Sequence, residues 1–121
     1  MASIQDFRSI EEYRQWLRMD CLFSKYPIDE IRRNGLDHLP SLRANLSGSY
    51  YNGLVDDWER ALMDPDPSHL RAVALDTTSY GINMRQNTPF AGILKPEDNL
   101  RIIKESRSEQ RTVLSSVASV R

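Results

Sequence analysis

The chain has 121 residues, of which 40% are hydrophobic and 27% charged, and its net charge is −1. This balance is typical of one folded domain and argues against a globally disordered chain. No apolar stretch approaches the roughly 20 residues that span a bilayer, the first residues lack the basic and apolar regions of a secretory signal, and the single cysteine, Cys21, has no intrachain partner. We therefore expect a cytoplasmic protein.

Two amphipathic helices centred on tryptophans are the clearest elements. Apolar residues spaced three and four apart lie on one face of a helix, which must be buried. The two sets are Ile10, Tyr13, Trp16, Leu17 and Cys21, and Tyr51, Leu54, Val55, Trp58 and Leu62. Ser9 and Glu12 have the spacing of a capping box, which predicts that the first helix begins there. The second helix is predicted over residues 50–63, and both tryptophans are expected in the core.

Proline and glycine residues predict where the helices in the rest of the chain begin and end. A short helix is predicted from Pro27 to Asn34 that ends at Gly35, because glycine favours the left-handed conformation at helix ends. A second short turn is predicted to begin at Pro40. Asp66 and Pro67 are typical of a helix start. The continuation of that fourth helix is open, since Thr77–Tyr80 favours strand or turn, and a short strand near residues 73–82 is the alternative.

The C-terminal third is predicted to be a loop followed by a helix. Residues 87–95 form a loop that places apolar side chains in the core, and Pro96 opens the last helix. Its heptad pattern is interrupted by Arg107 and Gln110. We expect an all-α, single-domain bundle of about five helices, formed by a globular part (1–105) and a C-terminal helical extension (106–121). That extension docks, frays or holds a homo-oligomer together.

Two segments have the composition of a protein-binding surface. Asp56, Asp57 and Glu59 form an acidic run that could steer the chain onto a basic partner. Residues 79–90 are dense in Tyr, Met, Arg and Asn, residue types that are enriched at interfaces or, in the alternative, form core. The candidate contacts are Asp56, Asp57, Glu59, Tyr80, Arg85 and Phe90.

The sequence gives only weak indications of a catalytic, metal-binding or phosphate-binding site. Arg33 and His38 have the Arg-x4-His spacing of metal-independent ribonucleases of the HEPN class, in which an arginine holds phosphate and a histidine transfers a proton. The alternative is a helix end at which the arginine faces the negative pole of the helix dipole. The only other histidine, His69, has no partner at a metal-binding spacing, and phosphate-binding glycine loops are missing. We expect no metal and no cofactor.

We rank a non-enzymatic protein-binding module first, of the inhibitor, immunity, antitoxin or adaptor type, which acts by covering a partner's surface. One alternative is a DNA-binding regulator with a helix-turn-helix over 27–34 and 39–46, helped by the basic residues Arg101, Lys104, Arg107 and Arg111. The second is the ribonuclease that uses Arg33 and His38. Membrane association is not expected.

Overall fold

The structure, a computed structural model, describes the backbone of residues 2–119 and the side chains of residues 2–116. Within this part of the chain every regular element is helical, which confirms the predicted all-α class. The elements are a 3-10 helix, η1 (Ile4–Asp6), and α1 (Ile10–Lys25), α2 (Ile28–Asn45), α3 (Ser49–Met63), α4 (Pro67–Leu75), α5 (Ser79–Gln86) and α6 (Pro96–Ser119). The strand considered near residues 73–82 is wrong: these residues end α4 and begin α5.

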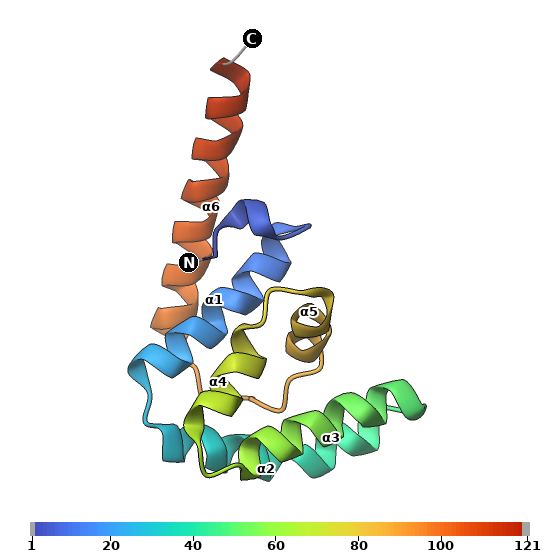
Figure 1. The fold of residues 1–121 in the computed structure, drawn as a ribbon. Helices are drawn as coiled ribbons and strands as arrows, with labels where there is room; N and C mark the ends of the chain where they lie inside the picture. Colours follow the sequence, from blue (N-terminus) through green and yellow to red (C-terminus); the bar gives the residue numbers. More distant parts are fainter. Residues whose placement is uncertain (1, 120–121) are drawn as a thin grey trace.

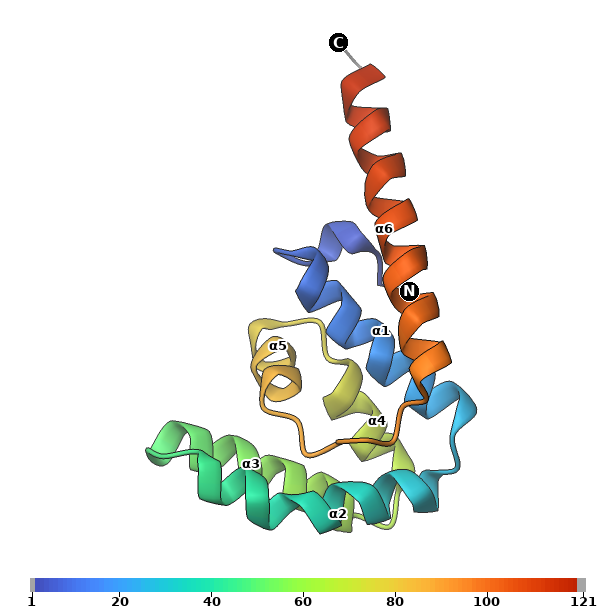
Figure 2. The same cartoon turned by 180° about the vertical axis from the view of Figure 1, so that it is seen from behind.

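The short helix α4 lies at the centre of the fold and contacts α1, α3 and α5. Helices α2 and α3 lie side by side and antiparallel as one arm of the molecule, while α6 runs along α1 and extends past the other elements (Figures 1 and 2). No helix among the described residues has both the length and the hydropathy needed to cross a bilayer.

The core forms around Trp58, whose side chain is 0% exposed. Phe90, from the segment between α5 and α6, packs its ring edge-on against Trp58 with 5.5 Å between ring centres. Trp16 is also buried, so both tryptophans occupy the core positions expected of them. The predicted insertion of the 87–95 segment into the core is confirmed by Pro89 and Phe90, which are both buried.

Helix α2 differs most from its prediction. It continues through Gly35 and Pro40 to Asn45, so the expected helix end at Gly35 is wrong. The glycine instead allows close approach: a Cβ at this position would lie 2.8 Å from a Leu62 methyl and 2.9 Å from the Phe90 ring. Ile31, Gly35 and Leu39 are buried along one face. Burial of this face offsets the hydrogen bond that Pro40 removes from the helix interior.

Two short helices have their C-terminal carbonyls satisfied by core side chains. The indole Nε1 of Trp16 donates to the Leu75 carbonyl at the end of α4, over 3.0 Å. The indole Nε1 of Trp58 donates to the carbonyls of Met84 and Asn87 at the end of α5, over 3.2 and 3.0 Å. Buried carbonyls at helix ends need such partners. The tryptophans therefore supply polar contacts as well as apolar bulk.

The start of α6 is bonded to the end of α1. The Tyr26 hydroxyl donates to Asp98 and accepts from the Lys95 N–H, over 3.0 and 2.9 Å. Lys25 and Arg101 both form ion pairs with the buried Asp98 carboxylate. The contacts with Lys25 and Tyr26 hold the pKa of Asp98 below its ordinary value.

The predicted boundary between residues 105 and 106 falls within one continuous helix. Ser106 is buried, and its hydroxyl accepts a hydrogen bond of 2.8 Å from Arg14. Helix α6 contacts η1 as well as α1. The first part of the predicted extension therefore belongs to the packed body, while residues 120–121 lie outside the described part of the chain.

Candidate functional site: a tyrosine-lined hollow on α3 and α5

The structure separates the six predicted contact residues into two groups. Asp56, Asp57 and Glu59 lie on α3, and Tyr80 lies on the first turn of α5 beside Asp57. By contrast, Arg85 and Phe90 are only 2% and 8% exposed. Both side chains therefore belong to the interior, and only the first group can contact a partner.

Asp56, Asp57 and Tyr80 of the surface group line an open hollow of about 370 Å³ between the start of α3 and the start of α5. The lining residues are Ser49, Tyr50, Gly53, Leu54, Asp56, Asp57, Arg60 and Tyr80. We call this feature the tyrosine hollow. Leu54 is almost fully buried, and a Cβ on Gly53 would meet nothing within 4 Å.

Three exposed tyrosines gather at this hollow and its edge. Tyr50, Tyr51 and Tyr80 are 55%, 43% and 38% exposed. The rings of Tyr50 and Tyr51 meet edge to face with 5.3 Å between ring centres. Of the three, only Tyr80 belongs to the predicted site; the spacing of Tyr51 suggested core, and the position of Tyr50 beside the hollow depends on where α5 packs.

Hydrogen bonds fix the two tyrosines that line the hollow. The Tyr80 hydroxyl donates to Asp57 Oδ2 over 2.8 Å, and the Asn83 side-chain amide donates to the Tyr50 hydroxyl over 2.7 Å. Burial of its hydroxyl and the neighbouring Asp57 carboxylate raise the pKa of Tyr80 above the ordinary value. Both bonds connect α3 to α5, so the hollow depends on the docking of these two helices.

The acidic run is largely neutralised by two arginines. Arg43 of α2 lies 2.8 Å from Asp56 and 3.8 Å from Glu59. Arg60 forms an ion pair with Asp57 one turn away. Three carboxylates and two guanidinium groups leave a net charge of −1 on this surface, so it is less acidic than the run of Asp56, Asp57 and Glu59 alone suggests. Arg43 was missed because only the antiparallel packing of α2 on α3 places it there.

Arg85 belongs to α5, and its buried guanidinium lies at the C-terminal end of α4. Its Nη1 donates to the carbonyls of Ala74 and Asp76. Its Nε and Nη2 have no hydrogen-bond partner in the described part of the chain, and its guanidinium lies 6.0 Å from the centre of the Phe7 ring. Burial lowers the pKa of Arg85. The arginine in this interface-like segment therefore caps a helix in the interior.

The structure does not bring together the residues of the alternative sites that the sequence suggested. Arg33 and His38 are five residues apart on one continuous helix, which places their side chains on different faces, and His38 Nδ1 lies 2.7 Å from the Asn34 carbonyl of its own helix. The predicted helix-turn-helix is wrong, since residues 28–45 form a single helix. Among the described residues, no group of three or more His, Cys, Asp or Glu side chains is placed to hold a metal ion.

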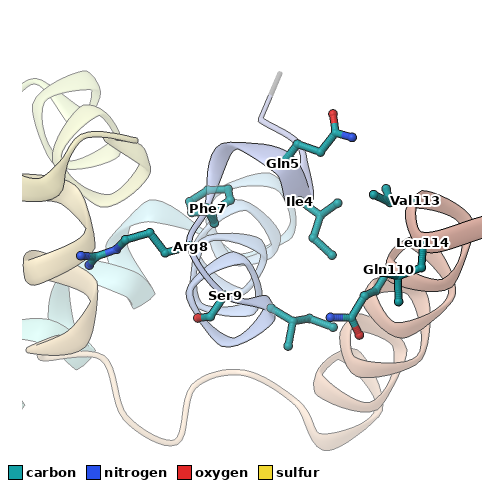
Figure 3. A pocket seen from close by; sticks show the side chains of 9 residues that line it. Ile4, Gln5, Phe7, Arg8, Ser9, Gln110, Val113 and Leu114 are labelled. Carbon is teal, nitrogen blue, oxygen red and sulfur yellow. The ribbon is translucent and has the colours of Figure 1, made fainter. Parts of the chain in front are cut away.

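A second hollow, of about 250 Å³, lies between η1 and α6. In Figure 3, Ile4 points across it toward Gln110, Val113 and Leu114, and Arg8 turns away from it. Arg8 forms an ion pair with Glu12 instead. This hollow therefore has mainly apolar walls, without the tyrosine and carboxylate groups of the first one.

Comparison with protein-family models, curated proteins and solved structures gave no match to this chain.

Proposed function

We propose that the chain is a non-enzymatic protein-binding module that covers part of a partner's surface with the tyrosine hollow and its edge. The gathering of three exposed tyrosines around one hollow supports this proposal. Tyrosine contributes a large contact area at low entropic cost and is enriched where binding energy concentrates. An inhibitor, immunity protein, antitoxin or adaptor acts in this way, by steric cover.

The fixed position of the rings favours binding over a purely structural role. Hydrogen bonds hold Tyr50 and Tyr80 before any partner arrives. A preorganised surface loses less conformational entropy on association. The mixture of Asp56, Asp57, Arg43 and Arg60 provides a polar rim of both signs, which is common around the apolar centre of an interface.

The test is a comparison of captured proteins between matched variants. The tagged chain is incubated with untreated and with nuclease-treated extract from its native cells, next to the double variant Tyr50→Ala, Tyr80→Ala and the control Met63→Ser. Met63 is 65% exposed at the far end of α3. We expect a stoichiometric partner that wild type and control retain and the double variant loses.

Equal capture by all three proteins would contradict the proposal, provided that circular dichroism shows the double variant to be folded. A partner whose capture disappears after nuclease treatment would favour the nucleic-acid alternatives instead.

A second candidate function is self-association through α6. Leu100 and Leu114, two heptads apart on this helix, are 66% and 63% exposed. A second copy that packs on this face would bury both leucines.

Light scattering of the wild type and of Leu114→Glu over a range of concentrations tests self-association. We expect a dimer that the glutamate converts to a monomer. A wild type that stays monomeric at the highest concentration would exclude this candidate.

A further inference from the structure

The Arg60 side chain occupies one wall of the tyrosine hollow in a way that suggests what the hollow binds. Its guanidinium pairs with Asp57 Oδ1, although 69% of the Arg60 side chain is exposed. An exposed ion pair between neighbouring turns contributes little to stability. Another cation of the same shape can therefore replace the Arg60 guanidinium at Asp57 at little energetic cost.

The carboxylate that receives this guanidinium is held in place. Asp57 Oδ2 accepts a hydrogen bond from the Tyr80 hydroxyl, while Oδ1 pairs with the Arg60 guanidinium. The Asp57 side chain is 29% exposed, so it is more strongly shielded than Asp56 and Glu59 at 50% and 56%. Shielding from water strengthens the attraction between this carboxylate and a cation.

The walls beside Asp57 are aromatic. Tyr50 and Tyr80 both line the hollow, and Leu54 lies beneath it. Aromatic faces attract cations, and arginine stacks on them while its fork pairs with a carboxylate. Lysine, a compact and strongly hydrated ammonium, matches this combination of aromatic side chains and a carboxylate less well.

We propose that the tyrosine hollow accepts an arginine side chain of the partner, whose guanidinium displaces that of Arg60 from Asp57 Oδ1. The assignment rests on the proposed function and names the group that the surface recognises. Arg43 pairs with both Asp56 and Glu59, and Asp57, the more shielded carboxylate, receives the incoming cation once Arg60 moves aside.

The probe for this proposal is N-acetyl-arginine-amide, with N-acetyl-citrulline-amide as its uncharged counterpart. Each is titrated into the full-length ¹⁵N-labelled chain. We expect saturable shifts of the Gly53, Arg60 and Tyr80 amides with the arginine probe and none with citrulline.

Two variants sharpen the test. Arg60→Gln removes the internal competitor and should tighten probe binding about two- to fivefold, the effect of losing one exposed ion pair. Asp57→Asn keeps an acceptor for the Tyr80 hydroxyl but removes the charge, and it should abolish saturation.

The proposal is overturned if citrulline binds as well as arginine, if the shifts lie on other elements, or if Arg60→Gln weakens binding. These failures can be told apart from failure of the proposed function. A partner lost by the tyrosine double variant but retained by Asp57→Asn contradicts only the arginine assignment. Binding of the arginine probe, together with unchanged capture by the tyrosine variant, contradicts only the protein-binding function.

Discussion

At the scale of single residues, each tryptophan combines apolar packing with a hydrogen bond to a helix end. Trp58→Phe keeps most of the aromatic volume but removes the indole N–H from the Asn87 carbonyl and from the Met84 carbonyl, which keeps only the Asn87 N–H as a donor. We expect a loss of about 1–3 kcal/mol in the free energy of unfolding, the cost of unsatisfied buried polar groups. Urea denaturation measures it. Trp16→Phe removes one indole hydrogen bond where Trp58→Phe removes two, and should cost less; equal losses would contradict this account.

The Asp98 carboxylate gives a pH-dependent prediction. Its pKa is below the ordinary value in the folded chain because Lys25 and Tyr26 stabilise the charged form. The stabilisation is therefore complete above the ordinary carboxyl pKa of about 3.9 and is lost as the pH falls through the lower folded value. We expect Asp98→Asn to lower the Tm at pH 7 and the difference from wild type to shrink below about pH 4. A difference that stays constant from pH 7 to pH 3 would show that charge is not the cause.

The sequence predicted features that depend on neighbouring residues well, and features that depend on the packing of distant helices poorly. Asp66, expected as an N-cap, accepts the Ser68 N–H over 3.0 Å. The Ser9 hydroxyl accepts the Glu12 N–H as expected, although the Glu12 carboxylate accepts from the Arg8 N–H. The burial of Arg85 and the pairing of Arg43 with Asp56 depend on how distant helices pack, and the sequence carries no local sign of either.

At the scale of elements, substitution of alanine for a helical glycine is expected to have opposite effects on stability at Gly81 and at Gly53. A Cβ on Gly81 would lie 1.8 Å from the Asp76 carbonyl oxygen, a backbone atom that cannot move aside alone. Gly53 has open space around it. Gly53→Ala should raise the free energy of unfolding by about 0.5–1 kcal/mol through helix propensity.

Gly81→Ala should be destabilising despite the same gain in propensity, because α5 must shift away from the end of α4. Thermal denaturation of both variants measures the contrast. If Gly81→Ala were neutral or stabilising, the close approach of the two helices would not exist in solution.

The boundaries of α2 show why element lengths were harder to predict than element types. Gly35 and Pro40 are ordinary stop signals, yet the helix passes through both. The side chain of Asn34 bonds both backbone groups of Ala91, over 2.8 and 3.1 Å, and so fastens the 87–95 segment to this helix. Tertiary packing therefore overrides the local preference. By contrast, α3 begins and ends within a residue of its prediction because its own apolar face specifies it.

At the scale of the whole molecule, α6 is part of the body well beyond residue 105. A chain that ends at Glu105 loses the Arg14–Ser106 hydrogen bond and the Gln110 and Val113 side chains beside η1. We expect this truncation to lower the free energy of unfolding by about 2 kcal/mol or more. Its control is a chain that ends at Ser116. Urea denaturation of both should show the longer chain near wild type; similar losses in the two would place the stabilising contacts elsewhere.

The contacts of the two indoles also give the molecule two optical reporters. Tryptophan emission responds to the polarity and the hydrogen bonding around the ring, and here Trp16 bonds the end of α4 while Trp58 bonds the end of α5. In single-tryptophan variants, fluorescence would follow the release of each short helix separately. The tyrosine hollow needs α5 in place, so the Trp58 signal would also report, without any added label, whether this surface is formed.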